Sequence, residues 1–320
     1  MNYVFFDIEC ANCLHGEGKI CSFGYVKTDE NFQVLKKKDI LVDPAAPFLL
    51  GNAKTGNGIR LAYPLFRFKW AHTFPFYYQE IKTLLEDKDS LAFGFAVKQD
   101  VSYLLFSARR YQLNPIRFRF YDIQLFEKEL HKRKNPSGLD TLIEFYHQDK
   151  FTYHRSDDDA LMTMEVFKSL LKENSFTARD VLQKYPDGLS DTQSLLTDLE
   201  NRKAKKRKKE DIKKKEDSLF LFFSKEEAPL QSADLSLYKK KIFITKDILI
   251  ENLSTLLAGK NKIRKKGARI VRSPEEADIL VLAFDDKDSP FFSHVKKDAK
   301  KMSIDELLGK FGIAKEKPSK

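Results

Sequence analysis

The sequence predicts a mixed α/β domain followed by a second, smaller α/β domain. Strand-like and helix-like segments alternate over residues 1–175, and the alternation resumes from Tyr238. Residues 176–235, between them, lack sustained apolar periodicity. Runs rich in β-branched and aromatic residues are typical of strands, and apolar residues at helical spacing are typical of amphipathic helices. The 320 residues, of which 42% are hydrophobic, suffice for two ordinary cores.

Three strands are expected first, at residues 3–9, 20–28 and 32–42, forming an antiparallel meander. Proline and glycine residues between Pro44 and Gly58 then mark a loop. The elements predicted next are a helix within residues 75–89, a strand at 91–97, a helix at 100–113, a strand at 117–123, and helices at about 124–133, 139–147 and 156–173. Strands joined through helices pair in parallel, so the sheet is predicted to be mixed.

A basic, flexible linker that is helical at most in part is expected at residues 176–235, after a first domain at 1–175. The second domain is expected at residues 236–315. Its predicted strands are at 240–245, 268–272 and 277–284, and its predicted helices are at about 247–265, 294–301 and 303–312. This alternation is typical of a small α/β domain.

The net charge of +10 is unevenly distributed along the chain. Residues 1–175 hold 24 basic and 23 acidic side chains, whereas residues 201–217 hold 10 basic and 4 acidic ones. Concentrated positive charge favours a polyanionic partner such as nucleic acid. The alternative is a solvated linker or a charged helix face, and "KAKKRKK" at residues 203–209 also resembles a nuclear import signal.

The composition argues against a secreted or membrane protein. No apolar run approaches the ~20 residues that span a bilayer, and the N-terminus lacks a charged segment followed by a cleavable apolar stretch. The three cysteines, Cys10, Cys13 and Cys21, do not suggest a disulfide framework. We therefore expect a cytoplasmic protein with no membrane partner. Together with His15, the cysteines leave a zinc site open as an alternative to small buried side chains.

Two carboxylates lie in the first predicted strand, in "FFDIEC" at residues 5–10. Side chains two apart on a strand point to the same face, so Asp7 and Glu9 are expected side by side. Like charges in an apolar setting repel and raise each other's pKa unless a cation holds them. Such oxygen ligands suit Mg²⁺ or Mn²⁺, whereas a strand end with two solvated acids is the alternative.

Two later segments offer partners for these acids. Asp100 stands where a predicted strand ends and a helix begins, a sheet edge at which sites are commonly built. In "YHRSDDDALMT", Ser156 is expected to cap a helix, with Asp159 as the acid of a capping box. His154 then lies in the loop just before this helix, where it can face the same cleft.

The motifs "FDIE", "KQDVSYL" and "HRSDDDA" resemble, in this order and spacing, those of the DEDDh 3′–5′ exonucleases, which include the epsilon proofreading subunit of bacterial DNA polymerase III. The resemblance covers about residues 1–175 and implies a ribonuclease H-like exonuclease fold with a mixed sheet. The sequence departs from the family pattern at Cys10, where threonine is usual, and at Phe95 and Ala96, which replace a His-Asn pair.

The resemblance implies roles for five side chains. Asp7, Glu9, Asp100 and Asp159 would hold two Mg²⁺ or Mn²⁺ ions, and His154 would be the general base. Two such ions activate the attacking water and stabilise the leaving oxygen of a phosphodiester, and an imidazole with a pKa of ~6.5 accepts a proton near neutrality. Asp157 and Asp158 are expected to face solvent instead.

These features predict a metal-dependent 3′–5′ exonuclease that removes nucleotides from single-stranded DNA ends in replication or repair. The alternatives are a 3′–5′ exoribonuclease and a non-catalytic, polymerase-associated scaffold, although the presence of all five residues argues against the scaffold. The second domain resembles the BRCT fold over about residues 238–314, through "KKIFIT", the glycine before "ARIVR", and "ADILVLAF". That resemblance implies a protein partner, a phosphopeptide or a DNA end as the ligand of this domain, without selecting among them, and a generic small α/β interaction domain is the alternative.

Overall fold

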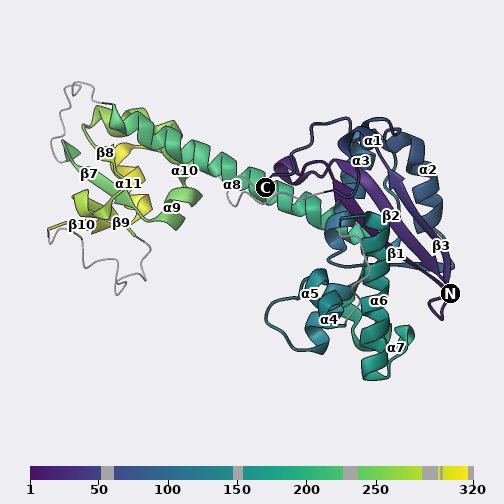
Figure 1. Ribbon diagram of the computed structural model, residues 1–320. Helices are drawn as coiled ribbons and strands as arrows, with labels where there is room; N and C mark the ends of the chain where they lie inside the picture. The colour runs from purple at the N-terminus through teal and green to yellow at the C-terminus, as the bar shows by residue number, and fades with distance from the viewer. Residues whose placement is uncertain (52–60, 147–153, 226–236, 283–294, 296–297, 316–320) are drawn as a thin grey trace. The chain divides into compact units, whose positions relative to one another are not determined.

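The computed structural model describes the whole chain except residues 52–60, 147–153, 226–236, 283–294, 296–297 and 316–320 (Figure 1). The chain divides into two compact units, Met1–Glu200 and Asn201–Lys320. Each unit combines one sheet with helices, so the α/β class is confirmed. Among the described residues, no helix has both the length and the apolar character that crossing a membrane requires.

The first unit contains a six-stranded sheet in the order β3-β2-β1-β4-β5-β6. Its strands are β1 (Asn2–Cys10), β2 (Ile20–Thr28), β3 (Val34–Leu41), β4 (Ser90–Gly94), β5 (Arg119–Asp122) and β6 (Leu189–Asp191). β1, β2 and β3 form the expected antiparallel meander, and β4 and β5 continue the sheet in parallel with β1. β6 pairs antiparallel with β5 at the edge, so the sheet is mixed as predicted.

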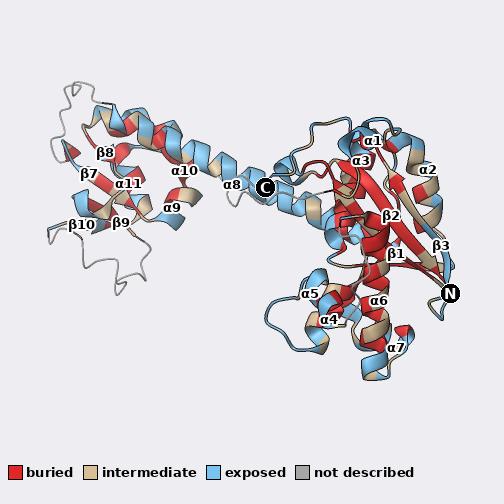
Figure 2. Cartoon of the chain, in the orientation of Figure 1, coloured by how far each residue is buried: buried red, intermediate tan, exposed pale blue. Residues whose placement is uncertain are grey.

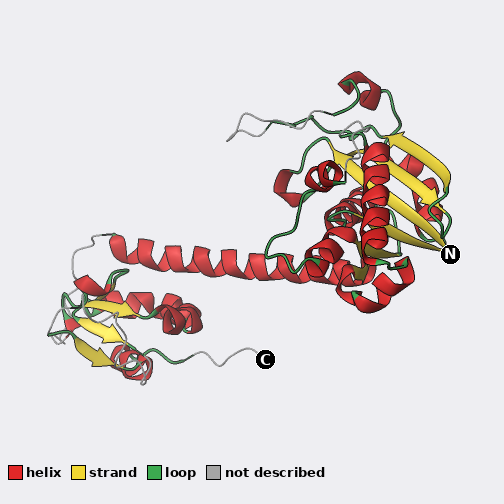
Figure 3. Ribbon diagram, turned by 60° about the horizontal axis from the view of Figure 1, so that its bottom comes forward, coloured by secondary structure: helices red, strands yellow, loops and turns green. Residues whose placement is uncertain are grey.

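Helices lie against both faces of this sheet, as the yellow strands and red helices of Figure 3 show. The helices of this unit are α1 (Leu65–Lys69), α2 (Phe74–Leu85), α3 (Lys98–Arg110), α4 (Ile123–Leu130), α5 (Leu139–Phe145), α6 (Ser156–Asn174), α7 (Ala178–Lys184) and, up to Glu200, the start of α8 (Thr192–Ser224), with short 3-10 turns η1 (Leu14–Gly16) and η2 (Pro186–Gly188). The last residue of the helix predicted at 139–147 lies outside the described residues, as does part of the loop predicted up to Gly58.

Alternation along β1 divides the core of the first unit into two clusters. Val4, Phe6 and Ile8 pack on one face of the sheet with α2 and α3. Tyr3 and Phe5 pack on the other face with α6 and α4. The period of two then places the next odd-numbered side chains of β1 on the α6 face. Both β1 and β2 are largely buried (Figure 2). Asp7 and Glu9, near the end of β1, therefore lie beside the hydrophobic core.

The structure differs from the prediction for residues 176–235. Residues 176–200 belong to the first unit because β6 completes the sheet and Leu195 of α8 packs in its core. The basic run at 201–217 is helical within α8, where residues 201–211 are exposed. Lys, Arg and Glu are good helix formers, which accounts for a helix without an apolar stripe. Residues 226–235 of the predicted linker lie outside the described residues.

The second unit contains a four-stranded, all-parallel sheet in the order β10-β9-β7-β8. Its elements are β7 (Lys241–Ile244), α9 (Lys246–Glu251), α10 (Leu253–Lys265), β8 (Arg269–Ile270), η4 (Pro274–Glu276), β9 (Ile279–Val281), β10 (Lys300–Met302) and α11 (Ile304–Phe311). The helix predicted at 247–265 is two helices, separated at Asn252. The helix predicted at 294–301 is wrong where the structure describes it, because Lys300 and Lys301 pair with β9.

Candidate active site

Three of the acids singled out from the sequence lie together at one end of the sheet. Asp7 and Glu9 stand near the carboxyl end of β1, and Asp159 stands in the first turn of α6. One carboxylate oxygen from each lies within 4.8 Å of the other two. In the part of the chain that the structure describes, no other three His, Cys, Asp or Glu side chains are grouped in this way. We call Asp7, Glu9 and Asp159 the acidic cluster.

Asp100 adjoins the acidic cluster without being part of its closest group. It lies buried in the first turn of α3. Burial raises the pKa of Asp100 well above its usual range, and the neighbouring charges of Asp7 and Glu9 raise it further. The fourth acid therefore interacts with Asp7 and Glu9, although the tightest grouping involves only the first three acids.

Ionising the acidic cluster is unfavourable in the absence of a bound cation. Burial, followed by the charge of Glu9, raises the pKa of Asp7 to about 8. Burial, followed by the charges of Asp7 and Glu9, raises the pKa of Asp159 to about 9. Within the described residues, one ion pair involves these four acids, and it joins His154 to Glu9. Converging carboxylate oxygens that are costly to ionise without a cation are suitable ligands for divalent cations such as Mg²⁺ or Mn²⁺.

His154 faces the acidic cluster from the turn before α6. Its Nδ1 lies 3.3 Å from Oε1 of Glu9, and its side chain is 47% exposed. The hydrogen bond to Glu9 raises the pKa of His154 above its usual value. The backbone of His154 has a φ of 62°, in the left-handed region that non-glycine residues adopt at a cost. The turn holds the imidazole beside the acids despite that cost.

A glycine in β2 allows α6 to approach the sheet closely enough to form the cluster. Gly24 pairs with Asp7 on one side and with Asp39 on the other. A Cβ atom at Gly24 would overlap backbone atoms of Ser156 and Asp157, at the start of α6. The backbone of α6 therefore rests directly on β2, which brings Asp159 to Asp7.

The capping box predicted for α6 is wrong. Arg155 occupies the N-cap position, with no capping hydrogen bond from its side chain. Ser156 is the first helical residue, and its hydroxyl donates a hydrogen bond to Oγ of Ser22 at 2.9 Å. The carboxylate of Asp159 accepts a hydrogen bond from the backbone N–H of His154 and none from Ser156, and the backbone N–H of Asp159 donates to the Arg155 carbonyl at 2.9 Å.

Asp157 and Asp158 do not face solvent as predicted. Both are buried, and the Lys37 ammonium of β3 forms an ion pair with each of them. The Arg155 guanidinium also donates to Asp157, with Nε 2.8 Å from Oδ1. These contacts fasten the start of α6 to β3. Lys37 and Asp39 share one face of β3. In the sequence, this alternation of a lysine with an acid in a predicted strand was the signal that could have indicated an ion-pairing role for Lys37.

The cysteines do not assemble a zinc site. Cys10 and Cys21 are buried, and all three cysteines are free. The Cys21 thiol lies 3.4 Å from the Glu9 carbonyl oxygen, and Cys13 Sγ lies 3.3 Å from the Tyr103 hydroxyl. Within the described residues, no three of Cys10, Cys13, His15 and Cys21 converge on a common point. Cys10 and Cys21 are instead small buried side chains next to Glu9.

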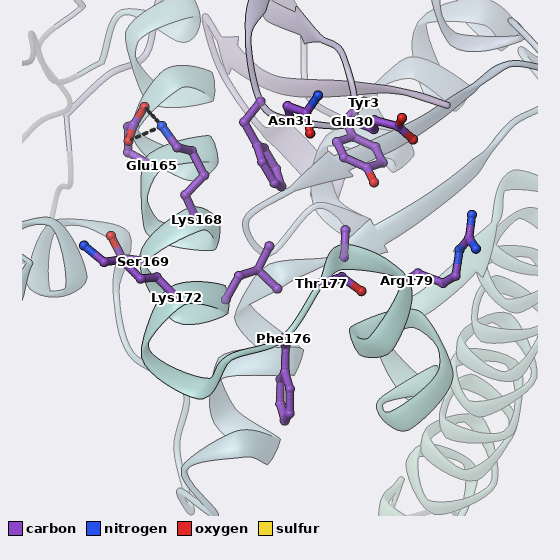
Figure 4. A pocket seen from close by; sticks show the side chains of 13 residues that line it. Tyr3, Glu30, Asn31, Glu165, Lys168, Ser169, Lys172, Phe176, Thr177 and Arg179 are labelled. Atoms are coloured by element: carbon purple, nitrogen blue, oxygen red, sulfur yellow. Dashed lines mark hydrogen bonds and ion pairs between the residues drawn. The ribbon is translucent and has the colours of Figure 1, made fainter.

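A separate groove of about 750 Å³ lies away from the acidic cluster (Figure 4). Tyr3 of β1, Lys168 and Lys172 of α6, and Arg179 of α7 contribute to its lining. Tyr3 precedes Asp7 by four residues, about 13 Å along a strand. Lys168 is already paired with Glu165, at 3.0 Å. The groove is therefore not part of the candidate active site.

Replacing Gly24 with alanine should destabilise the protein and impair the site together. The new methyl group meets backbone, which cannot rotate away, so α6 must shift. Overpacking of this kind typically costs about 1–3 kcal/mol. Urea denaturation monitored by circular dichroism measures the loss. Gly51→Ala is the matched control because a Cβ atom there meets nothing within 4 Å; equal stability of the two variants would contradict the close approach of α6.

Comparisons with known proteins give similarity at the level of structure only. No family model and no curated protein matches the sequence. The structure titled "3'-end specific recognition of histone mRNA stem-loop by 3'-exonuclease" is similar at 13% identity and a TM-score of 0.43, over 54% of this chain and 82% of the other. Pop2p of S. pombe, in its Mg²⁺- and Mn²⁺-bound form, is similar at 14% identity and a TM-score of 0.45, over 58% and 87%.

E. coli exonuclease I in complex with a dA16 oligonucleotide is similar at 14% identity and a TM-score of 0.42, over 53% of this chain and 41% of the other. At these sequence identities and TM-scores, any conclusion about function has to rest on the residues of this chain.

Proposed function

We propose that the first unit is a metal-dependent 3′–5′ exonuclease that removes nucleotides from single-stranded DNA ends in replication or repair, acting in the cytoplasm. The observation that carries this proposal is the convergence of Asp7, Glu9 and Asp159 within 4.8 Å. Asp100 adjoins them, and His154 contacts Glu9. The free state of all three cysteines agrees with a reducing compartment.

Asp7 interacts with each of the other acids, because its charge raises the pKa of both Asp100 and Asp159 and the charge of Glu9 raises its own. Asp7 would therefore share in holding divalent ions with the other three acids. When bound, such ions supply an activated water and stabilise the leaving 3′ oxygen. His154, half-exposed beside Glu9, would act there as the proton acceptor.

The proposal is tested by digesting 5′-labelled single-stranded DNA, blunt duplex DNA and RNA with Mg²⁺ or Mn²⁺. Stepwise shortening of the linear single strand is expected, and a circular single strand should resist. Release of a 3′ label in the first turnover would establish the direction. Cleavage of the circle would indicate an endonuclease, preference for RNA would indicate an exoribonuclease, and binding without cleavage would favour a scaffold.

The basic run in α8 should supply affinity and not chemistry. Its ten Lys and Arg side chains lie in residues 201–217, most of them exposed. Each phosphate contact contributes a salt slope of about −0.7 on single strands. Changing these ten residues to Gln keeps good helix formers and should weaken oligonucleotide binding and flatten its salt dependence. Fluorescence anisotropy across a salt series measures both effects.

The matched control changes the lysines of the same run to arginine, which preserves the charge and should preserve the slope. Single-turnover rates at saturating substrate should stay near the original value in both variants, because the acidic cluster lies outside the run. An unchanged slope in the Gln variant would mean that the run is only a spacer.

For the second unit we propose a BRCT-like domain that binds a protein partner. Its support is the all-parallel order β8-β7-β9-β10 together with helices α10 and α11. Affinity capture with this unit in the full chain, compared with a chain that ends at Glu200, tests the proposal. Loss of the same partners from the shorter chain is the expected result.

A further inference from the structure

Four exposed rings gather on α1 and at the start of α2. Phe66 on α1 and Trp70, the residue that follows α1, are 51% and 82% exposed, with ring centroids 5.1 Å apart. His72 and Phe76 follow as a stacked pair with centroids 3.9 Å apart, and Phe76 is 65% exposed. Phe68, by contrast, is buried and anchors α1. Exposed apolar rings that no core requires mark a binding surface. We call Phe66, Trp70, His72 and Phe76 the aromatic strip.

The segment that carries the aromatic strip is joined to the loop of the candidate general base. The backbone N–H of Ala62 donates to the carbonyl of His154 at 3.3 Å. The Tyr63 ring contacts two guanidinium groups, Arg67 on α1 at 4.9 Å and Arg155 next to His154 at 5.7 Å. The residues just before α1 therefore lie beside the turn that carries His154, and the strip follows them in the chain.

The positive charge around the aromatic strip indicates which class of ligand binds there. Residues 44–79 contain four basic and no acidic side chains. Arg67 and Lys69, which alternate with the rings on α1, are exposed. Aromatic rings interleaved with basic groups bind single-stranded nucleic acid, because unpaired bases stack on the rings while the cations meet the phosphates. In a duplex the bases are already stacked and paired, so their faces are not available.

We propose that the aromatic strip is a stacking platform for unpaired bases of a single-stranded nucleic acid whose 3′ end lies in the acidic cluster. This inference rests on the proposed exonuclease function and specifies its substrate. The end to be cleaved must pass beside His154, and the nucleotides on its 5′ side then reach α1. A blunt duplex end cannot engage the strip unless its terminal base pairs separate.

Trp70 permits a direct test because it is the single tryptophan of the chain. Its fluorescence is recorded while the full-length protein is titrated, with Mg²⁺ present, with oligothymidylate that carries hydrolysis-resistant phosphorothioate linkages. An abasic oligonucleotide of equal length and a blunt duplex serve as comparisons. Strong quenching by the base-bearing single strand and weak quenching by the other two are expected. Equal quenching by the abasic strand would overturn the proposal, as would binding seen by anisotropy without any quenching.

Kinetics provide a second readout. Phe66→Ala and Trp70→Ala should each raise KM for single-stranded DNA by about 5- to 100-fold, the range of one base–ring stack, with kcat little changed. Trp70→Phe should retain most of the affinity, since a flat ring remains. Leu35→Ala is the matched control, because Leu35 is an exposed apolar side chain on β3 outside the strip. An unchanged KM in both alanine variants would reject the platform.

Different results would contradict the proposed exonuclease and the proposed stacking platform. Hydrolysis with an unchanged KM in the strip variants leaves the exonuclease intact and removes the platform. Base-dependent quenching without hydrolysis of any substrate keeps the platform and removes the exonuclease. Absence of binding to every oligonucleotide would remove both.

Discussion

Asp7→Asn is expected to abolish nucleotide release without unfolding the protein. Asp7 interacts with every other acid of the site, so its loss removes a ligand for both ions. The rate should fall by more than the ~10²–10³-fold that follows removal of one hydrogen-bond donor to a transition-state charge. EDTA should do the same to the unmodified protein, reversibly. Full activity in EDTA would exclude a divalent-metal mechanism.

The same substitution should change how stability depends on pH and on Mg²⁺. The folded protein raises the pKa of Asp7 from 3.8 to about 8, so the metal-free fold is favoured when this carboxyl is protonated. Its contribution is fully present below about pH 3.8 and is lost as the pH rises through about 8. Asn cannot ionise, so the metal-free variant should lose less stability over that window.

Thermal denaturation between pH 5 and pH 9, with and without Mg²⁺, measures both effects. Mg²⁺ should raise the Tm of the unmodified protein, since a ligand that binds only the folded state stabilises it, and should have little effect on Asp7→Asn. The matched control is Asp198→Asn, an exposed acid on α8, which should behave like the parent. A full Mg²⁺-dependent rise in Asp7→Asn would show that the ions bind elsewhere.

Strands β1 to β5 were predictable because they carry their own pattern, whereas β6 lies in the segment that was expected to be a linker. In β1, apolar side chains alternate between two cores, and the same period of two places Asp7 and Glu9 on the face that receives α6. Local chemistry of this kind depends only on neighbours in the sequence. The pattern of Ser156 and Asp159 likewise indicated where α6 begins, although Ser156 is the first helical residue and not the cap.

Features that depend on contacts between distant segments were not predictable. Asp157 and Asp158 have the composition of surface acids, and only the arrival of Lys37 from β3 makes their burial tolerable. Gly24 carries no signal until the backbone of α6 is placed on β2. The helix in the basic run was missed for a different reason, because apolar periodicity was the criterion and residues 201–211 have no buried face.

His154→Ala is expected to lower kcat by the ~10²–10⁴-fold usual for a lost general base. The imidazole contacts Glu9 and stands half-exposed, so it is within reach of a water held by the acids. Because His154 is not one of the acidic ligands, the Mg²⁺-dependent rise in Tm should persist in this variant. A defect in the acidic cluster is instead expected to lose both the rate and metal binding, so the Mg²⁺-dependent rise in Tm distinguishes the two kinds of variant.

The pH profile distinguishes a base from a structural residue. The hydrogen bond to Glu9 raises the pKa of His154, so the neutral imidazole that accepts a proton is lost at a pH higher than for a free histidine. The kcat/KM of the parent should therefore fall on the acidic side with an apparent pKa above 6.5, and His154→Ala should lack that limb. His15→Asn, which replaces an exposed histidine that also has a positive φ, is the matched control and should keep the parental profile. If His154→Ala retained both the rate and the acidic limb, the proton acceptor would have to be another group.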